Sequence, residues 1–163
     1  MHAARRWENQ PAHGLTPEDL DASEVIRTVD EAIRRQRLED PGTRDAHELL
    51  TSFGLIEDGR LLNAAVVLFA RRDRLRPHYP QCMLRMARFR GVDKSEFIDN
   101  RQEQGNAFHI YQVAQRFLQD HLPVAGRVLP NVFERVDDPL FPTTTLREAI
   151  ANALSPKFLS IQH

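Results

Sequence analysis

The sequence is poor in cysteine, with one residue, Cys82, among 163. A disulfide needs two cysteines, so the chain has no internal disulfide framework, and a lone cysteine in an apolar segment favours a reducing compartment. Its apolar runs are far shorter than the roughly 20 residues that a membrane-spanning helix needs. The N-terminal stretch MHAARRWENQ has no apolar signal core. We therefore expect a soluble cytoplasmic domain with no membrane partner.

Neither sign of charge dominates, since the formal net charge is −1. Any nucleic-acid binding must then come from a local patch. The seven glycines stand singly, so the sequence has no glycine-rich phosphate loop. The seven histidines form no pair with metal-ligand spacing, so no metal site is expected. Serine, cysteine and histidine suggest no nucleophile arrangement.

Hydrophobic periodicity predicts helices in the N-terminal part of a single domain. Residues 1–15 have no periodicity and predict an irregular arm, with Trp7 as an anchor on the domain or, alternatively, an interface residue. Apolar residues spaced three and four apart predict a helix from about Ser23. Thr43 is the expected cap of a further helix that stops at Gly54.

The middle of the chain predicts strands. Asp58-Gly59 is a tight-turn signal between short apolar pieces. Two apolar runs, near 64–70 and 82–90, predict strands that pair in a small mixed or antiparallel sheet, the first covered on both faces. Residues 95–100 are expected to form a short extended piece.

The remainder predicts a long helix near 103–121 and a C-terminal helix that starts at 143–145. Between them, 128–136 is expected to be extended and 137–139 to form a turn. N-terminal helices, a small sheet and two later helices make the expected fold class α+β.

Arginines are concentrated beside the expected strand near 82–90. They could form one positive surface for nucleic acid. The alternative is a solvated rim whose arginines pair with Asp73, Asp93 and Glu96. The arginines concerned are Arg71, Arg72, Arg74, Arg76, Arg85, Arg88 and Arg90.

One pair near the C-terminus could carry chemistry. Glu148 and Asn152 are four residues apart, so they share one face of a helix. A carboxylate that polarises water, beside an amide oxygen that binds Mg²⁺, suits hydrolysis of a nucleotide phosphate. Alternatively, Thr145-x-x-Glu148 is a capping box, which would explain Glu148 without any chemistry.

An ordered series of motifs, from about Trp7 to Leu154, resembles bacterial ATP-binding transcriptional regulators related to the C-terminal part of the DNA helicase RecG. The series covers nearly the whole chain. The motifs are DGRLLNAAVVLF at 58–69, RFRGVDKSEFID at 88–99, Gly105-Asn106, HLPV at 121–124 and LREAIANA at 146–153.

In that family a Schlafen AlbA-type DNA-binding domain precedes a connecting α+β region and a GHKL-like ATPase domain. The resemblance implies that residues 16–140 are the connecting domain, after the arm, and that 141–163 start the ATPase domain. It also implies that Glu148 stands where the water-activating carboxylate would be. Asn152 would then be the Mg²⁺ ligand for Mg-ATP.

The chain departs from the family after residue 154. Relatives continue with a His-Arg-Asp-Tyr-like sequence, whereas this chain reads Ser155-Pro156-Lys157-Phe158, and Pro156 is expected to end the helix. We therefore expect a connecting and interaction module with no ATPase activity and no cofactor, in which Glu148 is vestigial. Its expected partners are the AlbA-type and ATPase domains of an intact homologue. DNA binding through the arginines and homo-oligomer formation are the alternatives.

Overall fold

The computed structural model describes residues 6–75, 78–91, 96–128, 135–139 and 141–159. They form the α+β fold expected from the sequence. The α-helices in this described part are α1 (Ala22–Arg34), α2 (Ala46–Ser52), α3 (Asn63–Phe69), α4 (Ala107–His121) and α5 (Thr143–Leu159). The strands are β1 (Ile56–Glu57), β2 (Arg60–Leu61), β3 (Met83–Phe89), β4 (Phe97–Gln104), β5 (Val124–Val128) and β6 (Arg135–Pro139). Short 3-10 turns are η1 (Trp7–Asn9), η2 (Pro17–Asp19), η3 (Arg72–Arg74) and η4 (Pro80–Cys82).

The described strands form three two-stranded antiparallel sheets, β1–β2, β3–β4 and β5–β6. The β1–β2 turn confirms the prediction for Asp58-Gly59. Asp58 has φ 51° and Gly59 has φ 72°. Two successive positive φ angles define the type I′ turn, whose twist matches that of a hairpin.

Aspartate caps start the first two helices. Asp21 Oδ1 accepts a hydrogen bond from the Glu24 amide over 3.1 Å, and α1 then buries Val25 and Val29 on one face. Asp45, rather than the expected Thr43, caps α2 by accepting from the Glu48 amide over 2.9 Å. Both helices occur where periodicity predicts them.

The predicted strand near 64–70 is wrong, because this run is the helix α3. Its neighbours are α1, α4 and η1, so nearly every side of the helix is covered by protein. A helix surrounded in this way needs no polar face, and its sequence then lacks the 3.6-residue pattern that marks a surface helix. Its buried members are Asn63, Ala65, Val66, Val67 and Phe69.

The strand β3 therefore has a different partner from the one predicted. It pairs with β4, and the two make a long hairpin, the β3–β4 ribbon. The residues of β4 take up the first part of the predicted helix 103–121, which starts instead at Ala107. Asn106 marks the boundary, because its Oδ1 accepts from the His109 amide over 2.9 Å and caps α4.

Two expectations for the last third of the chain also change. The predicted turn at 137–139 lies within β6, which pairs with β5. Of the segment predicted to be extended, 129–134 lies outside the described residues. The last helix starts at Thr143 as predicted, but it continues past Pro156 to Leu159, so Pro156 does not end it.

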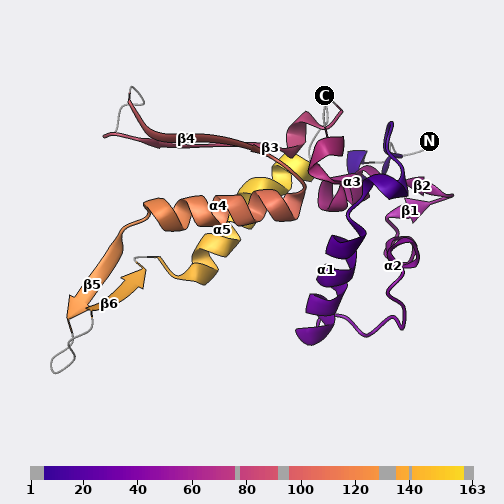
Figure 1. The fold of residues 1–163 in the computed structure, drawn as a ribbon, viewed down its shortest axis with the longest axis horizontal. Helices are drawn as coiled ribbons and strands as arrows, with labels where there is room; N and C mark the ends of the chain where they lie inside the picture. The colour runs from indigo at the N-terminus through magenta and orange to yellow at the C-terminus, as the bar shows by residue number, and fades with distance from the viewer. Residues whose placement is uncertain (1–5, 76–77, 92–95, 129–134, 140, 160–163) are drawn as a thin grey trace.

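Helix α4 organises the arrangement of the elements. It lies between the β3–β4 ribbon and α5. The β5–β6 hairpin lies at one end of the molecule, and α1, α2 and the β1–β2 hairpin lie at the opposite end (Figure 1). Ile110, Ala114 and Phe117 recur on its buried face at intervals of four and three residues. The core is continuous from α1 and α3 through α4 to Ile150 and Leu154 of α5.

The N-terminal arm is held on α3 by its backbone. Pro11 of the arm forms a β-bridge with Leu62, and Leu20, just after the arm, forms another with Ala70, so the N-terminal segment meets the chain at both ends of α3. Trp7 is partly buried against the core, as expected for an anchor. Its ring meets that of Tyr79 edge-on, with centroids 6.2 Å apart.

Candidate nucleic-acid interface

The pairing register of the β3–β4 ribbon sorts its residues onto two faces. Partners across the ribbon point to the same side, and side chains alternate along each strand. We call the side turned toward α4 the inner face and the opposite side the outer face. The inner face carries Leu84, Met86, Arg88, Asp99, Arg101 and Glu103. The outer face carries Met83, Arg85, Ala87, Asn100, Gln102 and Gln104. After Arg88 the register shifts, and the rings of Phe89 and Phe97 meet near the tip with centroids 4.7 Å apart.

The inner face packs on α4. Met86 is buried and belongs to the core cluster. The Arg101 guanidinium lies over the ring of Phe117, 5.3 Å from its centroid. This cover on one side leaves the outer face as the solvent side of the ribbon in Figure 1.

Polar groups on the inner face are satisfied within a cluster at the end of α4. Asp99 Oδ2 accepts from Arg101 Nη2 over 2.7 Å and lies 2.8 Å from His121 Nε2. Arg88 Nη1 lies 3.3 Å from His121 Nδ1, and because a guanidinium only donates, Nδ1 accepts and Nε2 donates to Asp99. The hydrogen bonds from Arg101 and His121 hold the pKa of Asp99 below its ordinary value of 3.8.

The outer face has a different composition. Arg85 and Gln102 lie directly opposite each other, Asn100 lies opposite Ala87, and all four side chains are exposed. This face of the ribbon carries no carboxylate, because the acidic residues Asp99 and Glu103 of β4 both belong to the inner face. The exposed middle of this face therefore carries one guanidinium and two amides, while Phe97, which is 53% exposed, adds an apolar group near the tip.

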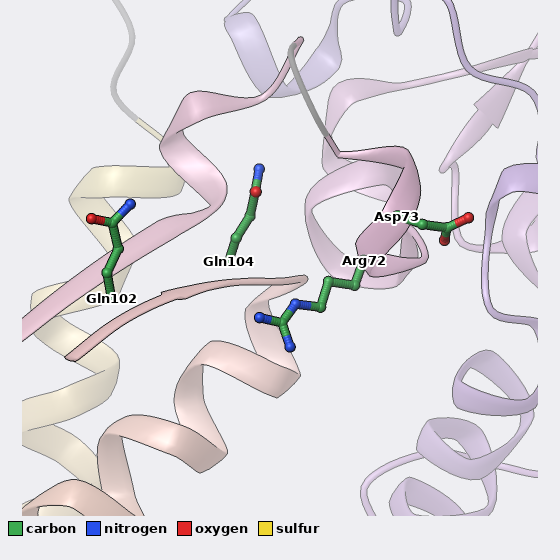
Figure 2. A pocket seen from close by; sticks show the side chains of 4 residues that line it. All are labelled: Arg72, Asp73, Gln102 and Gln104. Atoms are coloured by element: carbon green, nitrogen blue, oxygen red, sulfur yellow. The ribbon is translucent and has the colours of Figure 1, made fainter.

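A hollow of about 520 Å³ lies between η3 and the base of the ribbon, lined by Arg72, Asp73, Gln102 and Gln104. Figure 2 shows the Arg72 side chain reaching toward β4, while Asp73 points away from it. Arg72 Nη2 lies 3.1 Å from Glu103 Oε2. The hollow thus extends the polar outer face onto η3.

The predicted arginines that the structure describes do not all lie on one face of the ribbon. Arg71, Arg72 and Arg74 lie on and beside η3, and each forms an ion pair, with Asp73, Glu103 and Asp19 respectively. Of the predicted carboxylate partners, Asp73 lies in this group, whereas Glu103 and Asp19 were not predicted.

Along the ribbon, Arg88 belongs to the inner face, and Arg90 lies at the tip with its Nε 3.4 Å from Glu96 Oε2. Arg85 is exposed on the outer face and forms no ion pair with any described residue. Arg76 lies outside the described residues. Arg85 is thus the arginine best placed to meet a ligand on the ribbon.

Glu148 and Asn152 share one face of α5, as their spacing predicts, and both are exposed. Ile150 and Leu154 lie on the opposite side of the helix and are buried against the core. Thr145 is the third residue of α5 and not its cap, so the capping-box explanation of Glu148 is wrong. The described residues contain no group of three side chains suited to holding a metal ion.

Asn100 and Gln102 were not predicted as site residues. Their alternation on one strand would have revealed them, but the sequence pattern assigned 95–100 to a short extended piece and Gln102 to the approach to a helix. Correct bounds for β4 place both amides on the side of Arg85.

No helix in the described part of the chain is long and apolar enough to cross a bilayer.

Comparison with known proteins yields one structural relative to report. No family model matches the chain, and no curated protein matches it significantly. The crystal structure of the DIP2311 protein from Corynebacterium diphtheriae is similar over 93% of this chain, with a TM-score of 0.62 and 20% identity. The chain spans 28% of the length of that protein. The likeness concerns the fold alone, which in DIP2311 is part of a much longer chain.

Proposed function

We propose that this chain is the connecting domain of an ATP-binding transcriptional regulator, a structural and interaction module without ATPase activity of its own. The arrangement of α5 supports this proposal. Ile150 and Leu154 join the helix to the core, while Glu148 and Asn152 face solvent one turn apart. In this proposal α5 joins the core on one side and contacts the ATPase domain on the other.

The resemblance of 146–153 to the first ATP-binding motif assigns the exposed side of α5 to an ATPase domain. Hydrolysis requires a nucleotide held by several donors, with one positioned water, in a site that excludes bulk solvent. Glu148 and Asn152 supply a carboxylate and an amide on an open helix face, and the phosphate-binding groups must come from elsewhere.

Thermal melting of the purified chain with Mg-ATP tests the proposal. We expect no change in Tm at millimolar nucleotide, because a ligand stabilises a protein only by binding its folded state. We expect Asn152→Ala to melt as the wild type does with or without nucleotide. A nucleotide-dependent rise in Tm that Asn152→Ala abolishes would overturn the proposal.

A second candidate function is nucleic-acid binding, which the composition of the outer face favours. Arg85 is exposed without an ion pair in the described structure, and the face around it carries no carboxylate. Binding would release counterions, so the logarithm of affinity should fall with that of salt concentration, with a slope of about −0.9 per phosphate neutralised on duplex DNA. Fluorescence anisotropy at several salt concentrations measures this slope, and undetectable binding at low salt would exclude the function.

A further inference from the structure

We propose that the outer face of the β3–β4 ribbon enters the major groove of duplex DNA, where Arg85, Asn100 and Gln102 contact base edges. This inference rests on the second candidate function, nucleic-acid binding. It adds the form of the nucleic acid, the groove and the residues that read it.

The ribbon has the dimensions of a groove reader. Its two strands lie about 4.8 Å apart, and the major groove, about 12 Å wide, admits a two-stranded ribbon with its side chains. The seven residues of β3 span about 23 Å, close to seven base pairs. In the described part of the chain β3 and β4 pair only with each other, so no third strand widens the ribbon.

The side chains on the outer face match the groups exposed in that groove. Arginine forms paired hydrogen bonds with guanine, and asparagine or glutamine does so with adenine. Arg85 and Gln102 are directly opposite each other, and Asn100 is the next outward residue along β4. These three therefore lie within the space of neighbouring base pairs. Ala87, directly opposite Asn100 on β3, offers an apolar contact for a thymine methyl group.

Arginines at the two ends of the ribbon can contact the DNA backbone. Arg72 and Arg74 lie at its base and Arg90 at its tip, with exposed side-chain fractions of 64%, 51% and 72%. Water and salt screen ion pairs whose guanidinium group is exposed in this way, so such pairs are weak. Each guanidinium can therefore exchange its carboxylate partner for a phosphate at little cost. Such contacts position the ribbon, and the base contacts add sequence preference.

Negative charge on the ribbon is directed away from the groove. Asp99 is held on the inner face by Arg101 and His121, and Glu103 lies beside Arg72 and His109. A second copy of the chain fits this face less well than DNA does, because it would bring its own Arg85 against a surface without carboxylates. Like charges meeting at an interface disfavour association.

The experiment compares two near-isosteric charge changes in the full chain. Gln102→Glu places a carboxylate on the outer face, and Gln112→Glu adds the same charge at an exposed position of α4. Anisotropy with a labelled random-sequence DNA duplex at low salt should show Gln102→Glu weakening binding about tenfold or more. Gln112→Glu should stay within about twofold. Double-stranded RNA of the same sequence should bind about tenfold more weakly, because its major groove is too deep and narrow for side chains to read.

The other outcomes separate this inference from the function on which it rests. If both variants bind alike, or RNA binds as well as DNA, the groove contact is overturned while nucleic-acid binding stands. If the wild type binds no nucleic acid, both are overturned. If the wild type is a dimer by light scattering and Gln102→Glu makes it a monomer, the outer face is a self-association surface, and the inference is overturned.

Discussion

Tyr79 donates a hydrogen bond from its hydroxyl group to Asn63 Oδ1 over 2.9 Å, and both residues are buried. The same asparagine donates from its Nδ2 to the carbonyl of Trp7 over 2.9 Å. The tyrosine hydroxyl also accepts from the His13 amide over 3.3 Å. One buried polar pair thus links α3 to two points of the N-terminal arm.

Replacing Tyr79 by phenylalanine should destabilise the protein by about 1–3 kcal/mol, because it leaves Asn63 Oδ1 buried without its donor. Urea unfolding followed by circular dichroism measures the change. Tyr111→Phe is the matched control, since that hydroxyl only accepts from the exposed Arg147 side chain over 3.3 Å, and its cost should be within about 0.5 kcal/mol. Equal costs for the two variants would contradict the role of the buried pair.

The same hydroxyl predicts a loss of stability at alkaline pH. Burial raises the pKa of Tyr79 above its ordinary value of 10.0, so the folded state keeps this proton at a pH where the unfolded chain loses it. The folded state then binds more protons than the unfolded state, and the free energy of unfolding falls as pH rises above 10. Urea midpoints between pH 8 and about pH 11 should decline. The decline should be shallower in Tyr79→Phe, and parallel curves would argue against this origin.

A methyl group at Gly105 should not fit beside α4. A Cβ atom there would lie 2.9 Å from His109 Cγ and closer still to Cδ2. Gly105→Ala should therefore cost about 1–3 kcal/mol. In a His109→Ala background the ring is absent. The cost of Gly105→Ala in unfolding free energy should then be smaller by about 1 kcal/mol or more. Thermal and urea unfolding of the four proteins give this coupling, and strictly additive costs would rule out the clash.

The two sides of α5 should respond differently to truncation. Leu154→Ala removes a side chain that is 7% exposed and should cost about 2–4 kcal/mol, because it leaves a cavity against the core. Asn152→Ala on the exposed side should change stability by no more than about 0.5 kcal/mol. Denaturant unfolding distinguishes the two. A large cost at Asn152 would mean that the face assigned to an ATPase domain already packs within this chain.

The error at α3 shows where pattern reading is ambiguous. The predicted turn at Asp58-Gly59 is confirmed, because a type I′ turn is determined by residues next to one another. The run 64–70 could be a buried strand or a buried helix by periodicity alone. Its structure depends on α1 and α4, which surround it and lie far away in the sequence.

The candidate interface was only partly predictable for the same reason. The sequence pattern grouped Arg85 with Arg88. Side chains alternate between the two faces of a strand, however, so residues three apart point to opposite faces. Arg88 consequently meets His121, while Arg85 faces outward. Asn100 and Gln102 stand beside Arg85 only through the register of β4, which no local pattern of residues contains.

The bridges at both ends of α3 affect the order in which the molecule can assemble during synthesis. The arm emerges from the ribosome well before the residues that bind it. Trp7 and Asn63 are 56 positions apart, and His13 and Tyr79 are 66 positions apart. Until Tyr79 has left the exit tunnel, the arm has no native contact at that residue. Contacts between such distant segments close late, because the entropy of the loop must be overcome first. The N-terminal segment should thus stay open to proteases on the nascent chain until residues 63–79 have emerged.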